Sequence, residues 1–332
     1  VMIDDQFIGK INGLKLELDL KKGALETDIK SLKKAARQTV SPELEKRIQV
    51  IIETSLINLE NDFKIYWKDS PIARLLSGRD YLNPNIELIV DDILEKNQSQ
   101  KLLEFLENWL KNKINTTLKS LIDLKNLKEK NSSMKALAYQ LYENNGVLKR
   151  EQVSEYLKKL EQNERKILRD LGVKFGRYHV FLHRLIKPDA VSLRTLLWKN
   201  YNQKNFTLKP PTFGLNFIDS NKVKDKNFML LCGFEKFENF FIRIDILERL
   251  FVQIINSSSE KEKQVKMMPE MLNLLGCHKE NFKKLLKSMN YIVLEKNDET
   301  YFKYKPKKIF KKTHKKIERE NPFGVLKDFN FN

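Results

Sequence analysis

The sequence predicts a mainly α-helical chain with short β-hairpins, an α+β class, divided into several domains. Long stretches repeat apolar residues with helical spacing, and short β-rich runs bounded by Gly and Pro lie between them. The length of 332 residues suggests two or three domains. We predict a mixed region with a long amphipathic helix at 1–130, a helical domain at 131–215, a winged-helix-like domain at 228–305 and a basic tail at 306–332.

The first part of the chain mixes strand and helix signals. Residues 6–20 alternate apolar and polar side chains around two glycines, which predicts a hairpin. Residues 24–61 have helical spacing, and we expect two helices there. Pro42 would begin the second helix, with Ser41 as its N-cap, because proline is well tolerated in a first helical turn.

Longer helices and further strands are expected in the middle of the chain. Residues 63–90 contain Pro, Gly and short apolar runs, which indicates strands and turns. Residues 98–124 form one amphipathic pattern and predict a single long helix. Two or three short helices are expected over 134–171. The sequence GVKFGRYHVFL then predicts a strand block, followed by a helix over 189–201.

The last folded segment has the order of a winged-helix domain. Apolar spacing predicts helices over 244–255, 269–275 and 279–289. Two β-rich runs follow, at 291–295 and 300–304, and four polar residues separate them. Helix, helix, turn, helix and hairpin is the order expected of a winged helix.

The charge of the chain favours polyanionic partners. The formal net charge is +18 and the isoelectric point is about 9.5. Residues 303–319 hold eight lysines and one arginine against one acid, a net charge of +8. Lysines that neutralise phosphates release condensed counterions, so a nucleic acid is the expected partner. A genome rich in A and T would also enrich lysine codons.

The sequence contains no recognisable catalytic, metal or cofactor motif. Nucleotide hydrolysis needs a glycine-rich loop ending in Gly-Lys-Ser/Thr, and the one Gly-Lys pair, Gly9-Lys10, is followed by Ile11. His179 and His183 have a spacing that suits zinc on a helix, but the residues between them favour a strand. We therefore expect no catalytic residue, no metal site and no cofactor in this chain.

The sequence also indicates where in the cell the protein is located. No apolar run is long enough to span a bilayer, and no signal pattern precedes the first element, so we expect no membrane contact. Two isolated cysteines, Cys232 and Cys277, suit a reducing cytoplasm. Val1 already lies within an alternating pattern, so we expect the chain to be a piece of a longer polypeptide.

Several sequence blocks occur in the order found in one helicase family. Their strongest member is LGVKFGRYHVFL followed by LIKP. The others are IARLL at 72–76, GVL at 146–148, LLW at 196–198, RIDIL at 243–247, LGC at 275–277 and NPFGVL at 321–326. The chain resembles the C-terminal region of alphaproteobacterial superfamily-two helicases similar to the mitochondrial degradosome (suppressor-of-var-type) RNA helicase. His183 departs from the family pattern, where proline is expected, and so does the lysine-rich tail.

The resemblance implies a nucleic-acid-binding accessory region of an ATP-dependent RNA or DNA helicase. ATP and Mg²⁺ would then be bound by the motor domains of the parent protein and not by this chain. The alternative is a protein-interaction scaffold that docks a ribonuclease or another partner to the helicase.

Basic residues of the winged-helix-like segment are the candidate nucleic-acid ligands. The third helix and the wing would supply Lys279, Lys283, Lys284, Lys287, Lys296, Lys303 and Lys305. We expect the helix to bury Phe282, Leu285, Leu286 and Met289. A second candidate face would consist of Lys174, Arg177 and Lys187.

Overall fold

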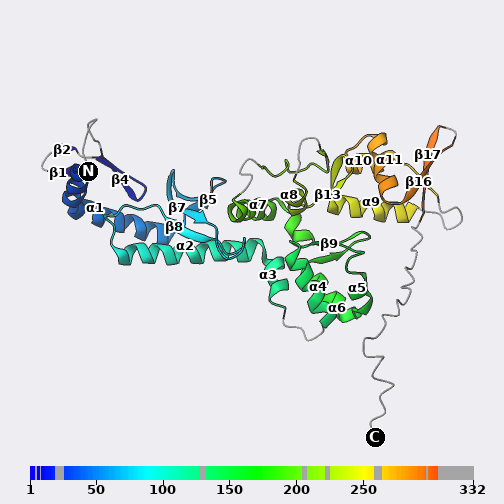
Figure 1. The fold of residues 1–332 in the computed structure, drawn as a ribbon, viewed down its shortest axis with the longest axis horizontal. Coiled ribbons are helices and arrows are strands. Elements are labelled where there is room, and N and C mark those ends of the chain that lie inside the picture. The colour runs from blue at the N-terminus through cyan, green and yellow to red at the C-terminus, as the bar shows by residue number, and fades with distance from the viewer. Residues whose placement is uncertain are drawn as a thin grey trace, which may run out of the picture. The chain divides into compact units, whose positions relative to one another are not determined.

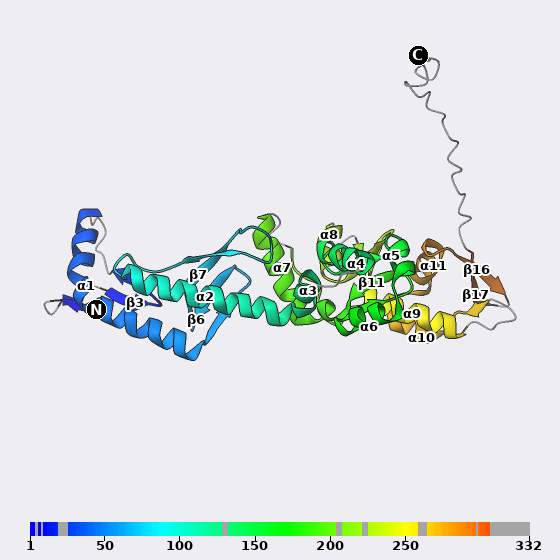
Figure 2. The same ribbon diagram turned by 90° about the horizontal axis from the view of Figure 1, so that it is seen from below.

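The structure is a computed structural model, shown in Figures 1 and 2. It describes residues 1–3, 6–7, 9–18, 26–127, 132–203, 208–220, 225–257, 264–296 and 298–305. The helices are α1 (Glu26–Thr54), α2 (Lys96–Thr117), α3 (Lys119–Lys125), α4 (Ser132–Glu143), α5 (Ser154–Lys159), α6 (Gln162–Asp170), α7 (Pro188–Asn202), α8 (Lys226–Leu231), α9 (Ile244–Ser257), α10 (Pro269–Leu275) and α11 (Lys279–Ser288), with a 3-10 helix at His183–Ile186.

The strands of the described chain pair in small antiparallel sheets. They are β1 (Met2–Ile3), β2 (Gln6–Phe7), β3 (Gly9–Asn12), β4 (Lys15–Leu18), β5 (Ile57–Leu59), β6 (Lys64–Trp67), β7 (Ser70–Leu76), β8 (Asn85–Leu88), β9 (Val147–Lys149), β10 (Val173–Phe175), β11 (His179–Leu182), β12 (Phe217–Asp219), β13 (Phe234–Phe237), β14 (Phe240–Arg243), β15 (Val265–Lys266), β16 (Tyr291–Lys296) and β17 (Glu299–Tyr304). The largest of these sheets has four strands, in the order β5-β6-β7-β8. A mixed fold of helices and short antiparallel hairpins is therefore confirmed.

The chain divides into two compact units. Unit 1 takes residues 1–256 and 270–277, and unit 2 takes residues 257–269 and 278–332. The predicted boundaries near residues 130 and 215 fall inside unit 1, and the segment 228–305 predicted as one winged-helix-like domain is shared between the two units. The predicted division into domains therefore stays a prediction. The basic tail at 306–332 lies outside the described residues.

The predicted first hairpin is confirmed as β3 and β4. The two strands pair from Gly9 opposite Leu18 to Asn12 opposite Lys15, and the turn begins at Gly13. Gly13 has a φ of +58°, and an added Cβ would come within 2.7 Å of the side chain of the serine that begins β7. Glycine is therefore required at this turn for both its conformation and its size.

The prediction of two helices over 24–61 is wrong. The single helix α1 runs through Pro42, so Ser41 is not an N-cap. A proline inside a helix removes one backbone hydrogen bond and costs about 3 kcal/mol. Here the apolar stripe continues across the proline: Ala36, Val40 and Leu44 are fully buried. Packing of one continuous face offsets the local cost, and α1 is visibly bent in Figure 2.

The long helix predicted over 98–124 is two helices, α2 and α3. They meet at Leu118, whose φ of −105° and ψ of 24° depart from helical values. The apolar stripe nevertheless continues through the break, since Ile114, Leu118 and Leu121 are all buried. Periodicity alone could therefore not reveal the junction. Figures 1 and 2 both show α2 running beside α1.

The middle of unit 1 is a helical cluster with one small sheet. The predicted strand block forms β10 and β11, and β9 completes the sheet in the order β10-β11-β9. Strand β9 is absent from the prediction because it is only three residues long. The helices α4, α5 and α6 gather near β9 in Figure 1. The helix predicted over 189–201 is confirmed as α7, with Pro188 in its first turn.

One side chain of α7 joins three segments of unit 1. The Arg194 side chain is 0% exposed, and its guanidinium donates to the backbone oxygens of Asn145 (2.8 Å), Leu185 (2.9 Å) and Leu231 (2.6 Å). Those oxygens follow α4, lie in the 3-10 helix and end α8. A buried cation is tolerated here because backbone oxygens replace its hydration.

Unit 2 contains α11 and a three-stranded sheet in the order β15-β17-β16. The Phe282 ring of α11 meets the Phe302 ring of β17 edge-on, with centroids 6.2 Å apart. This contact joins the helix to the sheet. Within the described part of the chain, no helix combines the length and the apolar character that crossing a membrane requires.

Candidate nucleic-acid interface

Helix α11 separates an apolar face from a basic one. Phe282, Leu285 and Leu286 are 0% exposed and Met289 is 8% exposed, so the predicted buried stripe is confirmed. On a helix, positions three apart lie on one side, which places Lys284 and Lys287 together on the solvent face. Both lysines are exposed, as is Lys279 at the start of the helix.

Lys283 differs from the other lysines of α11. Its side chain is only 18% exposed, and its Nζ lies 2.6 Å from a carboxylate oxygen of Glu295 and 3.2 Å from one of Glu280. The hydrogen bond to Glu295, followed by the one to Glu280, raises the pKa of the Lys283 ammonium. Lys283 therefore joins α11 to β16. The sequence predicts it to be a candidate phosphate ligand, but its ammonium is engaged by these two carboxylates.

The β16–β17 hairpin, which the sequence predicts to be a wing and which is called the wing below, carries lysines on both of its strands. Lys296 ends β16, Lys303 lies in β17 and Lys305 follows it, and all three are exposed. In the strand register Lys303 pairs with Ile292. Cross-strand partners share a face of a sheet, and successive residues of a strand point to opposite faces. Lys303 and Ile292 thus share the face opposite the buried Phe302.

The described part of unit 2 is basic even after its ion pairs are considered. It holds eight lysines and four acidic residues, a net charge of +4. Lys266 pairs with Glu299, and Lys283 pairs with Glu295 and Glu280. The remaining lysines are exposed and make no ion pair within the described residues. They are Lys279, Lys284, Lys287, Lys296, Lys303 and Lys305.

The second predicted face lies in unit 1 and is only partly assembled. Lys174, Arg177 and Lys187 are all exposed. Lys174 lines a cleft of about 780 Å³, together with the rings of Phe175 and Phe181. Arg177 and Lys187 do not line this cleft. The three basic residues are close in sequence, but they do not line this cleft together.

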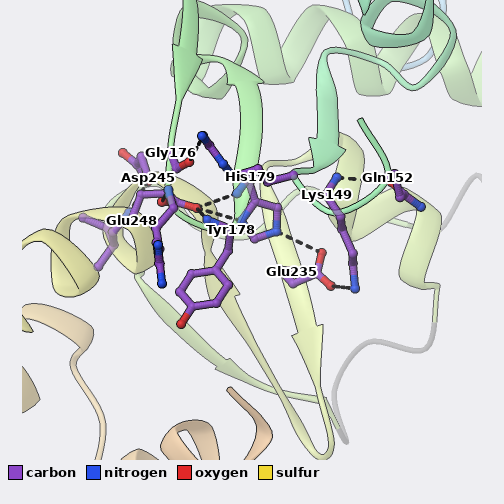
Figure 3. Close-up of polar contacts among 11 residues, drawn as sticks. Lys149, Gln152, Gly176, Tyr178, His179, Glu235, Asp245 and Glu248 are labelled. Atoms are coloured by element: carbon purple, nitrogen blue, oxygen red, sulfur yellow. Dashed lines mark hydrogen bonds and ion pairs between the residues drawn. The ribbon is translucent and has the colours of Figure 1, made fainter. Parts of the chain in front are cut away.

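The turn between β10 and β11 is held by one carboxylate from α9 (Figure 3). The Glu248 carboxylate accepts hydrogen bonds from three successive backbone N–H groups, of Arg177, Tyr178 (2.9 Å) and His179 (2.8 Å). An added Cβ at Gly176 would overlap the Glu248 carboxyl group. The sequence could not indicate this contact, because Tyr178 and Glu248 are 70 residues apart and a glutamate on a helix usually faces solvent.

His179 lies between two carboxylates in the same cluster. Its side chain is 4% exposed; Nδ1 lies 3.1 Å from Glu248 and Nε2 lies 3.6 Å from Glu235. Lys149 pairs with the other oxygen of Glu235 at 2.8 Å (Figure 3). Burial opposes protonation, but the hydrogen bonds to Glu235 and Glu248 outweigh it and raise the pKa of His179. Each ring nitrogen faces a carboxylate, one from Glu235 and one from Glu248, so this histidine joins β11, β13 and α9.

The His179 cluster makes stability depend on pH in a defined window. The raised pKa of His179 gives a contribution that is complete below about pH 6.5 and is lost as pH rises through the folded value. Burial raises the pKa of Glu235, but His179 and Lys149 lower it overall, so its contribution is lost as pH falls below about 4.5. The cluster therefore stabilises the fold most between about pH 4.5 and 6.5.

We expect the contribution of His179 to the free energy of unfolding to decline as pH rises above about 6.5, and to be absent from the His179→Gln variant. Urea unfolding at several pH values measures both. His278, an exposed histidine, supplies the matched control, because His278→Gln should leave the pH profile unchanged. Equal pH profiles for wild type and His179→Gln would contradict the assignment.

Both cysteines are free thiols, and burial raises the pKa of Cys232 to about 12 and that of Cys277 to about 11. Within the described ranges, no group of three or more His, Cys, Asp or Glu side chains is placed to hold a metal ion.

No protein-family model, curated protein or solved structure matches this chain.

Proposed function

We propose that this chain is a nucleic-acid-binding accessory region of an ATP-dependent helicase, with RNA as its main ligand and DNA as the alternative. The observation that carries the proposal is the set of six exposed lysines on α11 and the wing of unit 2, which form no ion pair among the described residues. These lysines can bind phosphates directly, because no ion pair with another described residue has to break first.

The order of elements supports a winged-helix assignment. Along the chain, α9, β15, α10, α11, β16 and β17 follow one another, and β15 pairs antiparallel with β17. Strand β15 adds to the order predicted from sequence the short third strand that a winged helix contains. In helix-turn-helix proteins the recognition helix contacts nucleic acid, and α11 would be the corresponding helix here.

The helicase part of the proposal rests on the sequence blocks that resemble the degradosome-type helicases. The chain lacks a phosphate-binding loop, so ATP and Mg²⁺ would belong to motor domains of the parent protein. The accessory region would hold the nucleic acid while those domains move along it. Phosphate contacts by lysine position a strand without reading its sequence.

A second candidate function is docking of a protein partner, such as a ribonuclease. The cleft of about 780 Å³ in unit 1 favours it, because Val252 is 57% exposed and lines the cleft together with the apolar side chains of Phe175, Phe181 and Leu274. Exposed aliphatic side chains that gather in a patch often mark protein contacts.

Fluorescence anisotropy with a labelled single-stranded RNA tests the proposed function. We expect binding by the purified chain that weakens as salt rises, without ATP hydrolysis. Copurification of a nuclease together with no RNA affinity at low salt, about 50 mM, would overturn the proposal in favour of the docking function.

A further inference from the structure

A second cleft of unit 1, of about 580 Å³, is lined by aromatic side chains from three separate parts of the chain. Tyr81 comes from the loop between β7 and β8, Tyr139 and Tyr142 come from α4, and Trp198 and Tyr201 come from α7. They are five of the 13 tyrosines and tryptophans of the sequence (10 and 3). The volume lies in the range of small-molecule sites, about 300–1,000 Å³.

Two of these rings are open to solvent. Tyr139 is 62% exposed and Tyr201 is 41% exposed, and they lie on different helices that border the same cleft. Trp198 and Tyr142 are half-buried and pack against the core, so they form the fixed part of the lining. Aromatic rings that are open on one face are the usual platforms on which unpaired bases stack.

The cleft also contains a polar group without a partner. The Tyr81 hydroxyl is buried and makes no hydrogen bond within the described part of the chain. Burial raises the pKa of Tyr81 to about 12, so the hydroxyl stays protonated and can both donate and accept. Because the hydroxyl is shielded from solvent, Tyr81 presents its ring to the cleft lining and forms part of the wall beside Tyr142.

The charged side chains of the cleft lining are two lysines and two acids. Lys125 lies over the Tyr142 ring, with Nζ 5.1 Å from its centroid, and Lys135 is exposed. The Asp80 carboxylate is occupied, since it accepts two hydrogen bonds from the Asn83 amide, both of 2.8 Å. Glu143 is the other acid of the lining and is exposed. Tyrosine rings beside an open carboxylate also suit a quaternary ammonium, so tetramethylammonium is the competing ligand to test.

We infer that this cleft binds a base of a single-stranded nucleic acid, stacked on Tyr139 and Tyr201, with its phosphates near Lys125 and Lys135. The inference rests on the proposed function and adds a site to it. Stacking accepts every base, so the cleft would hold a strand without strong sequence preference.

The test compares single-stranded RNA binding by the full chain and by Tyr139→Ala/Tyr201→Ala. We expect the double variant to lose about tenfold or more in affinity, because the stacking contacts of the base are removed. The double phenylalanine variant should bind within about twofold of wild type, since phenylalanine also stacks. Phe213→Ala, which removes an aromatic ring that is 52% exposed outside the cleft, is the matched control.

Two results would overturn the inference while leaving the proposed function intact. One is unchanged RNA affinity in a folded Tyr139→Ala/Tyr201→Ala variant. The other is loss of affinity in the phenylalanine variant equal to that in the alanine variant, which would indicate a role other than stacking.

A mononucleotide probe separates failure of the cleft from failure of the proposed function. The fluorescence of 2-aminopurine ribonucleoside monophosphate should be quenched by the wild-type chain and not by the double alanine variant, whatever the affinity of unit 2 for RNA. Tetramethylammonium should not compete. Competition by tetramethylammonium, or no quenching by the wild-type chain, would overturn the inference.

Discussion

Reversing the charge of Lys284 and Lys287 should lower the affinity for single-stranded RNA by about 10- to 100-fold at roughly 100 mM salt. Both side chains are exposed on the solvent face of α11 and are not ion-paired within the described residues. Glutamate there removes two phosphate contacts and adds two repulsive charges. Because exposed substitutions change stability by about 0.5 kcal/mol or less, the Tm should stay nearly constant.

A control with the same change in net charge makes this result specific. Lys101 and Lys111 are exposed on α2 of unit 1, and their double replacement by glutamate changes the net charge by the same amount. Affinity should then fall only slightly. Lys283→Gln should likewise have a small effect, because Lys283 is engaged by Glu280 and Glu295. Equal losses in the α2 variant and the α11 variant would mean that total charge, and not this face, governs binding.

The largest effect on stability is expected at Arg194. Arg194→Leu should lower the free energy of unfolding by about 3–5 kcal/mol, because each buried carbonyl left without a donor costs about 1–3 kcal/mol. Relief of the buried charge offsets part of that cost. Chemical denaturation measures the difference, and the Tm of unit 1 should fall by roughly 5–9 °C.

Two variants control for the loss of an arginine. Arg184 is exposed in the 3-10 helix, so Arg184→Leu should change stability by about 0.5 kcal/mol or less. Arg194→Lys should recover only part of the stability, because an ammonium lacks the planar fork that reaches three separate oxygens. Wild-type stability in Arg194→Leu would show that the three oxygens find other donors.

The spacing of apolar residues was sufficient to predict an element correctly where one of its faces is buried and the other is exposed. The stripe of Phe282, Leu285 and Leu286 specified α11, and alternation around Gly13 specified the first hairpin. Pattern failed where packing overrides a local signal. Pro42 suggested a helix start, but burial on both sides of it keeps α1 continuous.

The sites were harder to predict because their members are distant in sequence. Lys283 has the same local pattern as its neighbours, and its pairing with Glu295 depends on how β16 lies against α11. The aromatic cleft brings Tyr81 and Tyr201 to one cavity across 120 residues of chain. The Tyr81 hydroxyl is buried and has no partner among the described residues. This follows from how the chain folds, and the amino-acid composition could not predict it.

The salt dependence of RNA affinity tests the central claim most directly. Anisotropy titrations of the purified chain between about 50 and 200 mM salt would give the slope of log K against log salt. If roughly three to five of the lysines on α11 and the wing contact phosphates, the slope for a single strand should lie between about −2 and −4. The Lys284→Glu/Lys287→Glu variant should have a shallower slope than wild type. A slope near zero for the wild-type chain, or no binding at the lowest salt concentration, would contradict the account.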